Sequence, residues 1–309
     1  MRGLSRREFL GGAAGVVAVA TLPPGGSTRA AAPASRAAAT APLAGATINP
    51  SAYGVKSSLD AANIYNGYVG MPLATTFEKV YLGHGAFPPE PPEKMAQLAP
   101  TGCQFLVSIE PSRTMTTTEQ NVLAKWLDRL TKSGIPYRVV LYSECNDKAF
   151  KTADEWFAYW SFYAPVVQAA GVPCGYDPGC GFMAIGRALE YFPSSPAPDE
   201  LWMDYYATAF RGGSRLDKLI AKARSGGVSC GVAEWGWAAG DTTFGPMTMP
   251  WWNTYCNYLM QLITSGKITL GAINFAAKAN GRTPDVINSA SDPRIPMIRA
   301  VAQTIQGTA

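Results

Sequence analysis

Two glutamates, Glu144 and Glu234, each stand at the end of a short apolar run of strand length. Residues 137–143 read Y-R-V-V-L-Y-S before Glu144, and residues 228–233 read V-S-C-G-V-A before Glu234. A glutamate just past a strand is usually a solvated loop residue, so either one alone predicts little. A matched pair, 90 residues apart in the chain, predicts one site with two carboxyl groups.

Two carboxyl groups can together hydrolyse a glycosidic bond. One donates a proton to the departing oxygen, and the other captures or stabilises the positive anomeric carbon. A separation of about 5 to 5.5 Å gives retention of the anomeric configuration, and about 6.5 to 9.5 Å gives inversion. One of the pair must keep its proton near neutral pH, which burial or the charge of the other can arrange.

Strand-like and helix-like segments alternate along the chain around this pair. Apolar segments with the composition of strands cover residues 51–56, 79–83, 104–109, 138–143, 172–176, 201–205, 229–233 and 269–275. The clearest helices between them cover residues 118–133, 152–170, 215–225, 250–265 and 294–306. This alternation predicts an α/β fold with a parallel sheet that closes into a (β/α)8 barrel, the TIM barrel. The fourth and seventh strands face one another across such a barrel, so we expect the shorter separation and retention.

Active residues of such barrels gather at the carboxyl ends of the strands. Besides the two glutamates, these ends carry Lys56, His84, Glu110, Asn146, Asp147, Asp177, Asp204, Tyr205, Tyr206, Trp235, Trp237 and Asn274. Carboxylates and amides bind hydroxyl groups, and flat rings stack on sugars, so this lining is typical of a site for a neutral polyhydroxylated ligand. We expect the substrate-binding residues to be Asn146, Trp235, Glu110, His84 and Asp204.

Some of these residues have a second interpretation. Trp235 and Trp237 alternate about a strand end, so at least one of them belongs to the core, and we assign Trp235 to the site. Glu110 can also simply end a strand. His84 lies between two glycines and can equally be a structural hydrogen-bonding residue.

The composition excludes several classes of site. The chain has 309 residues, of which 47% are hydrophobic and 16% charged, as in a globular protein. His84 is the one histidine, which excludes a His-rich zinc site, an H-E-x-x-H protease and a two-His iron site. No G-x-S-x-G elbow or nucleotide-binding glycine loop is present in a suitable context. We therefore expect neither a metal nor a cofactor.

The net charge of +4 comes from the first 36 residues. Five of the 26 basic residues and one of the 22 acidic residues lie there, so the remainder carries 21 of each. Electrostatic attraction to nucleic acid or to anionic lipid is therefore not expected. We expect a monomer that binds a carbohydrate substrate and no nucleic acid.

Residues 1–32 have the order of an export signal. S-R-R-E-F-L at residues 5–10 resembles a twin-arginine signal, and small residues at 30–32 offer a cleavage site. The apolar run at residues 9–22 is too short and too rich in Gly and Ala for a membrane span. We expect twin-arginine export and a secreted or extracytoplasmic protein with no membrane span in the mature chain. A tether that stays uncleaved is the alternative.

Residues 33–46 are rich in Ala with Pro, Ser and Thr and show no periodicity, so we expect a disordered spacer. No later stretch of this composition divides the chain. Residues 47–309 are thus predicted to form one catalytic domain, of the size expected for eight strand-helix units.

The motifs around both glutamates resemble those of clan A glycoside hydrolases. S-E-C-N at residues 143–146 resembles the E-x-N acid/base motif that ends strand four, and V-A-E-W-G-W at residues 232–237 resembles the nucleophile motif that ends strand seven. The nearest resemblance is to family 26, the β-mannanase family. Its strand-three W-E-P and its Y-Y-P-G-D…V-D-W-x-x-x-D-x-Y are similar to residues 108–111 and 191–206. The resemblance covers residues 50–305.

This resemblance implies a secreted retaining hydrolase of a β-linked polysaccharide or oligosaccharide. It implies that Glu144 is the acid/base, Glu234 the nucleophile and Tyr206 a hydrogen-bond donor that orients Glu234. Two positions depart from the family. Ser143 stands where the family usually has His, and I-N-F at residues 273–275 lacks the Trp that commonly floors the sugar site. These departures argue against mannan as the substrate more than they argue against sugar hydrolysis.

Two other functions stay open. A carbohydrate-binding or cell-envelope protein on an inactive barrel would account for the missing histidine, although pure binding needs neither an acid nor a nucleophile. Transglycosylation by the same glutamates differs only in whether water or a sugar hydroxyl attacks the intermediate.

Six cysteines in an exported protein allow many disulfide pairings. Cys174 and Cys180 frame a short loop and are the most favourable local bridge. Cys145 adjoins Glu144 but has no partner histidine to activate it as a nucleophile. Twin-arginine export follows folding, which indicates that the fold does not depend on disulfides.

Overall fold

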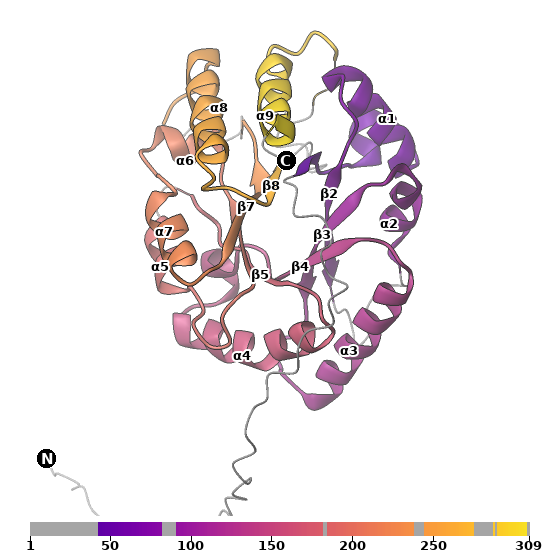
Figure 1. Cartoon of the computed structure of the whole chain (residues 1–309), viewed down its shortest axis with the longest axis vertical. Coiled ribbons are helices and arrows are strands. Elements are labelled where there is room, and N and C mark those ends of the chain that lie inside the picture. Colours follow the sequence, from indigo (N-terminus) through magenta and orange to yellow (C-terminus); the bar gives the residue numbers. More distant parts are fainter. Residues whose placement is uncertain are drawn as a thin grey trace, which may run out of the picture. The chain divides into compact units, whose positions relative to one another are not determined.

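The computed structural model describes residues 43–81, 91–181, 184–237, 244–274, 287 and 289–307. Within them, parallel strands form a closed barrel in chain order, surrounded by helices (Figure 1). The strands are β1 (Leu43–Ala46), β2 (Thr75–Tyr81), β3 (Gln104–Glu110), β4 (Tyr137–Leu141), β5 (Cys174–Tyr176), β6 (Glu200–Asp204), β7 (Ser229–Trp235) and β8 (Gly271–Asn274). β8 pairs with β1 and closes the barrel. The predicted (β/α)8 barrel is confirmed.

The helices lie around the outside of the barrel (Figure 1). They are α1 (Ser58–Val69), α2 (Glu93–Leu98), α3 (Thr117–Lys132), α4 (Ala153–Ala169), α5 (Ala184–Glu190), α6 (Ala207–Arg211), α7 (Asp217–Ser225), α8 (Met249–Thr264) and α9 (Ile295–Gly307). The sequence predicts α3, α4, α7, α8 and α9 to within two residues at each end. It does not predict α1, which contains Gly67 and two asparagines, nor the short α2, α5 and α6. None of the described helices is long and apolar enough to cross a membrane.

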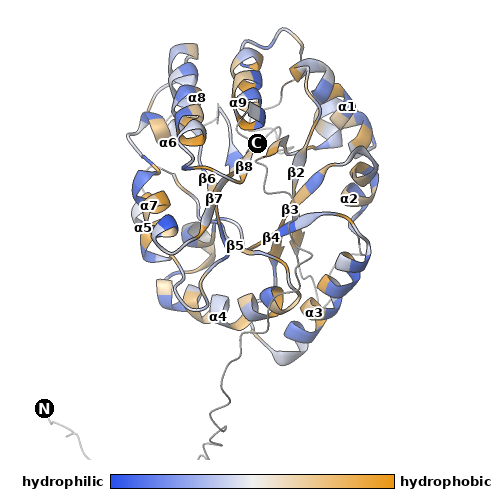
Figure 2. Cartoon of the chain, in the orientation of Figure 1, coloured by the Kyte–Doolittle hydropathy of each residue, from blue (hydrophilic) through white to orange (hydrophobic). Residues whose placement is uncertain are grey.

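An amphipathic pattern packs these helices on the barrel, as α3 shows. Its buried residues recur every three or four positions, which places them on one helix face. They are Leu123, Trp126, Leu127 and Leu130. A reciprocal cap between Thr116 and Glu119 starts the helix at the predicted place. Figure 2 shows hydrophilic and hydrophobic residues alternating along the helices in the same way.

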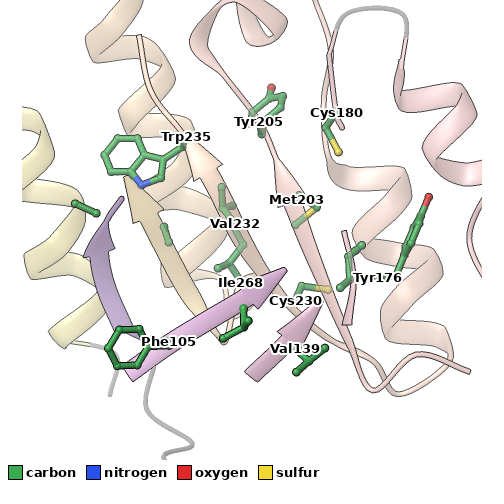
Figure 3. Packing of buried hydrophobic residues seen from close by; sticks show 14 of the residues in the cluster. Phe105, Val139, Tyr176, Cys180, Met203, Tyr205, Cys230, Val232, Trp235 and Ile268 are labelled. Carbon is green, nitrogen blue, oxygen red and sulfur yellow. The ribbon is translucent and has the colours of Figure 1, made fainter. Parts of the chain in front are cut away.

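Buried side chains form two layers, one on each face of the strands. Val139, Met203 and Val232 point out of the barrel and belong to the large cluster under the helices (Figure 3). The barrel interior holds a smaller cluster of Phe77, Leu106, Val140, Trp202 and Ala233. Side chains along each strand therefore alternate between the helix layer and the barrel interior.

Trp202 on β6 fills much of that interior. Gly175 on β5 and Gly231 on β7 flank it, and a Cβ on these glycines would lie 3.0 and 2.6 Å from the indole ring. Toward the amino ends of the strands, Arg138 forms an ion pair with Glu200, which also accepts a hydrogen bond from Trp202 Nε1 at 2.8 Å. Burial raises the pKa of Glu200, and the charge of Arg138 opposes this effect. The amino end of the barrel is thus plugged.

The first strand lies earlier in the chain than predicted. β1 falls inside residues 33–46, the predicted spacer, whereas the predicted strand at 51–56 begins in a 3-10 turn at Pro50–Tyr53. The L-A-G-A sequence of β1 suits a close contact, because a Cβ on Gly45 would lie 2.1 Å from the carbonyl oxygen of Thr75. The small residues that allow this contact are also typical of a linker, which is why the sequence predicts a spacer here. The barrel domain therefore begins before residue 47.

Candidate active site

Glu144 follows β4 in a strained turn. Its backbone has φ 52° and ψ 37°, in the left-handed region, and Tyr142 has φ 60°. Such a conformation costs a residue with a side chain about 1 to 3 kcal/mol, which the surrounding contacts must offset. One π-helical turn, Cys145–Ala149, follows directly. Strained residues and π-turns are frequent at functional sites.

Aromatic packing and hydrogen bonds hold both ends of this turn. The Tyr142 ring lies 5.1 Å from Phe150 and 5.7 Å from Tyr159, in edge-to-face geometry. The Phe150 carbonyl accepts from the Arg187 guanidinium at 3.3 Å and from the Tyr191 hydroxyl at 3.2 Å. The segment that carries Glu144 is therefore fixed from β4 through to α4.

Asn146 ties the same turn to the loop after β5. Its Nδ2 donates to the Gly179 carbonyl at 3.0 Å, and its Oδ1 accepts from the Gly179 N–H at 2.8 Å. A Cβ on Gly179 would lie 3.6 Å from Oε1 of Glu144, so the Gly179 backbone is close to that carboxyl. Asn146 is 0% exposed, and it therefore positions the turn and is not the sugar contact that the sequence predicts.

Ser143, the residue before Glu144, connects three strands. Its N–H donates to the Ser108 hydroxyl on β3 at 3.1 Å, and its own hydroxyl donates to Oδ2 of Asp204 on β6 at 3.3 Å. This serine replaces the histidine that the family resemblance leads one to expect. Asp204 is buried, so it anchors the turn and is not exposed for the predicted contact with substrate.

Glu234 reaches the barrel mouth because β7 contains a bulge. Met203 pairs with Val232 and Asp204 pairs with Glu234, so Ala233 is an extra residue on β7. Val232 faces the helices and Ala233 faces the interior, and strict alternation would return Glu234 to the helix side. The bulge instead pairs Glu234 with Asp204. Asp204 is two residues after Trp202 on β6 and so faces the barrel interior, as Trp202 does.

Tyr206 holds the carboxyl group of Glu234. Its hydroxyl donates to Oε2 of Glu234. Burial raises the pKa of the Tyr206 phenol well above its usual range, and the negative charges of Glu234, Asp204 and Glu144 raise it further. The phenol therefore stays protonated and remains a donor. Gly179 lies beside the Glu144 carboxyl and pairs with Asp204, and Asp204 pairs with Glu234, so both glutamates lie at the same end of the barrel.

Glu110 and His84 are two further predicted site residues. Glu110 ends β3 with the parity of Leu106 and Ser108, which places it on the interior side near the mouth. It lies close enough to raise the pKa of the Tyr159 phenol, an effect that is small beside that of burial. His84 lies outside the described residues.

Trp235 is not the sugar platform that the sequence predicts. It is 2% exposed and stacks on Trp252 of α8, with ring centroids 5.8 Å apart and an interplanar angle of 5°. It points away from the barrel, into the layer between the strands and the helices (Figure 3). Trp237, two residues on, is only partly buried. Trp235 therefore belongs to the core, and Trp237 is the more exposed of the two.

The six cysteines are all buried free thiols, so the predicted Cys174–Cys180 bridge is absent. Burial raises the pKa of Cys145 well above its usual range, and the charge of Asp177 adds to the effect. A thiol that stays protonated is a poor nucleophile. Cys145 is therefore not a candidate nucleophile.

Three supporting features have no signal in the sequence. The left-handed backbone at Glu144 occurs without a glycine, the bulge on β7 interrupts an ordinary strand pattern, and Gly179 is one of many loop glycines. Of the two residues in the Asn146–Gly179 hydrogen bonds, the sequence singles out only Asn146, two residues after Glu144.

The fold is similar to those of solved endo-β-1,4-mannanases. The catalytic domain of the family 26 enzyme from Bacillus sp. JAMB-750 matches with a TM-score of 0.56 and 13% identity over 85% of this chain and 86% of that one. The Cellulomonas fimi enzyme matches with a TM-score of 0.55 and 15% identity over 85% and 70%. A Bacillus subtilis mannanase matches with a TM-score of 0.54 and 14% identity over 82% and 84%.

No protein-family model matches the chain, and no curated protein matches it in sequence. The likeness at 13 to 15% identity is one of fold. At that level, the predicted resemblance to clan A glycoside hydrolases, and to family 26 among them, is confirmed.

Proposed function

We propose that this protein is a retaining glycoside hydrolase that cleaves a β-linked polysaccharide, with β-1,4-mannan as the first candidate. One observation carries the proposal: Glu234, which accepts a hydrogen bond from Tyr206, pairs with Asp204 on β6, and Asp204 pairs with Gly179, whose backbone lies against the Glu144 carboxyl. Carboxyl groups that end strands four and seven provide the acid and the nucleophile that the reaction needs. The fold neighbours described above are endo-β-1,4-mannanases, which supports the choice of substrate.

In the first step Glu144 gives its proton to the glycosidic oxygen as the bond from that oxygen to the anomeric carbon breaks. The Glu234 carboxylate forms a new bond to the same carbon. In the second step Glu144 takes a proton from water, whose oxygen attacks the carbon and displaces Glu234. Two inversions at one carbon give net retention.

Tyr206 supports the nucleophile in both steps. Its hydrogen bond favours the ionised form of Glu234, because a donor stabilises a carboxylate more than a carboxylic acid. The raised pKa keeps the Tyr206 proton on the phenol at neutral pH. The strained turn, braced by Asn146 and Ser143, holds Glu144 on the other side of the mouth.

Release of reducing sugar from soluble glycans tests this function. Galactomannan, glucomannan, barley β-glucan and xylan are incubated with the wild-type chain and with the variants Glu234→Gln and Glu190→Gln. Glu190 is an exposed glutamate at the end of α5 and serves as the matched control. We expect reducing sugar from at least one polymer, its loss in Glu234→Gln and its retention in Glu190→Gln. No release from any polymer, or release by Glu234→Gln at the wild-type rate, would refute the proposal.

Action outside the cytoplasm is also a proposal, and it rests on residues 1–32. The twin-arginine pair Arg6-Arg7 is its specific feature. Replacing both arginines by lysine in the full chain should leave the protein in the cytoplasm. Unchanged export of that variant would count against the twin-arginine route.

A further inference from the structure

Trp251 is the most exposed aromatic side chain near the mouth of the barrel. Among the described residues only Trp251, 38% exposed, and Leu59, 37% exposed, are large hydrophobic side chains in the open. Tryptophan is highly buried on average and is enriched at interfaces, so an exposed indole at this place is a candidate contact for a ligand. Its neighbour Trp252, about 100° further round the helix, is buried.

The position of Trp251 relates it to the candidate active site. Trp251 lies in the first turn of α8, which follows the loop after β7, the strand of Glu234. The short helix α6 starts right after Tyr206 and contacts α8 (Figure 1). Helices of a barrel begin on the side where the strands end, so the exposed indole lies on the rim of the mouth.

The indole is held in place by neighbours from α6. The Phe210 ring meets it edge to face, with centroids 6.5 Å apart. The Arg211 guanidinium lies 5.4 Å from the ring centroid, and it donates to the carbonyls of Gly245 and Pro246 at 3.1 and 2.6 Å. An exposed ring that is fixed before binding loses little freedom when a ligand stacks on it.

A second aromatic side chain lies between this ring and the nucleophile along the chain. Trp237 is three residues after Glu234, is partly exposed, and packs on Trp252 with centroids 5.7 Å apart. The Arg294 guanidinium lies 6.0 Å from its ring centroid. Trp237 thus packs on the residue that follows Trp251 in α8, so two partly exposed indoles lie where the end of β7 meets the start of α8.

We propose that Trp237 and Trp251 form an aromatic strip that binds a neutral β-linked polysaccharide outside the bond-cleaving site. Flat apolar rings pair with the apolar faces of pyranose units, and no charge on the ligand is required. This inference rests on the proposed function for the class of ligand. It adds that substrate binding extends over the rim, so long chains bind better than short ones.

Affinity electrophoresis in gels that contain galactomannan tests the strip without relying on turnover. The proteins are the full chain with Glu234→Gln, alone and combined with Trp251→Ala, Trp251→Phe or Leu59→Ala. Leu59→Ala removes an equally exposed apolar side chain from α1 and is the matched control. We expect retardation of the parent, about a two- to tenfold weaker apparent affinity with Trp251→Ala, an intermediate value with Trp251→Phe and no change with Leu59→Ala.

Kinetic assays of chains that keep Glu234 distinguish a failure of the aromatic strip from a failure of the proposed hydrolase function. Trp251→Ala should raise KM more for galactomannan than for mannotriose. If the wild-type chain cleaves galactomannan and Trp251→Ala equals Leu59→Ala in both assays, the strip is refuted and the hydrolase stands. If no reducing sugar is released from any glycan, the hydrolase is refuted, and the gels alone decide whether the rim binds polysaccharide. A parent that galactomannan does not retard also overturns the strip.

Discussion

The Asn146 carboxamide donates to the Gly179 carbonyl at 3.0 Å and accepts from the Gly179 N–H at 2.8 Å, beside the carboxyl of Glu144. This pair joins the end of β4 to the loop after β5, and Gly179 in turn bridges to Asp204 on β6. The left-handed backbone of Glu144 is therefore braced by the loop after β5, which is itself held on β6. The geometry of the candidate acid/base depends on side chains that do not themselves touch a substrate.

Replacing Asn146 with Ala should destabilise the fold and misplace Glu144. The Gly179 N–H and carbonyl would both lose their buried partner, at a cost of about 1 to 3 kcal/mol. Chemical denaturation measures this cost, with Asn121→Ala on the exposed face of α3 as control. We also expect kcat to fall more for substrates with poor leaving groups, which need the acid. An Asn146→Ala midpoint equal to that of the control would contradict the bracing role.

Replacing Tyr206 with Phe should lower kcat/KM by about ten- to hundredfold, because a hydrogen bond to a charged group contributes about 1.5 to 3 kcal/mol. Without the donor, the ionised form of Glu234 is less favoured and its pKa rises. The acidic limb of the pH–activity profile should therefore move to higher pH. Tyr68→Phe, on α1, is the control. An unmoved acidic limb with full activity would show that this hydrogen bond has no part in the reaction.

Replacing Gly45 with Ala tests where the barrel begins. The new Cβ would lie 2.1 Å from the Thr75 carbonyl oxygen, so β1 and β2 would have to separate, at a cost of at least about 1 to 3 kcal/mol. Gly67 in α1 has open space around it, and Gly67→Ala should stabilise by about 0.5 to 1 kcal/mol. If Gly45→Ala has the wild-type unfolding midpoint, residues 43–46 are not part of the barrel.

The buried thiols should make the fold sensitive to alkali. Burial raises the pKa of Cys103 and of Cys230 to about 12, from an ordinary value of 9.0. The folded chain keeps these protons while the unfolded chain releases them, so this stability is complete below about pH 9 and is lost as the pH rises toward 12. The urea midpoint should fall between pH 9 and 11, and less steeply in Cys230→Ala. A midpoint that is constant over this range, or rapid reaction of the native thiols with a disulfide reagent, would contradict their burial.

The strand-helix alternation and the two strand-end glutamates can be predicted from the sequence because both follow local patterns. Apolar runs that end on Glu144 and Glu234 place these residues at the mouth once the barrel closes. Tyr206 follows from the strand-six motif in the same way. These positions depend on the chain near each residue and on the barrel topology.

The features that the sequence does not reveal depend on contacts between distant segments. β1 has the composition of a linker because Gly45 meets Thr75 at close range. Trp235 and Trp237 differ in exposure because the bulge and the packing of α8 decide which ring is covered. Asn146 is buried because Gly179 completes its hydrogen bonds, a partner 33 residues away in the chain.

The pairing of Glu144 as acid/base with Glu234 as nucleophile is tested most directly by azide rescue. Glu144→Ala is incubated with an activated aryl β-mannobioside, with and without sodium azide, and the products are identified by proton NMR. An activated leaving group needs no acid, so the glycosyl intermediate on Glu234 should form, and azide should attack it without a base. Glu234→Ala provides the comparison, since azide can there replace only the nucleophile.

We expect azide to accelerate Glu144→Ala and to yield the β-glycosyl azide, while Glu234→Ala yields the α-azide. That pair of products would assign both glutamates and establish retention. An α-azide from Glu144→Ala, or turnover by both variants that azide does not change, would contradict the central claim that these two carboxyl groups carry out the reaction.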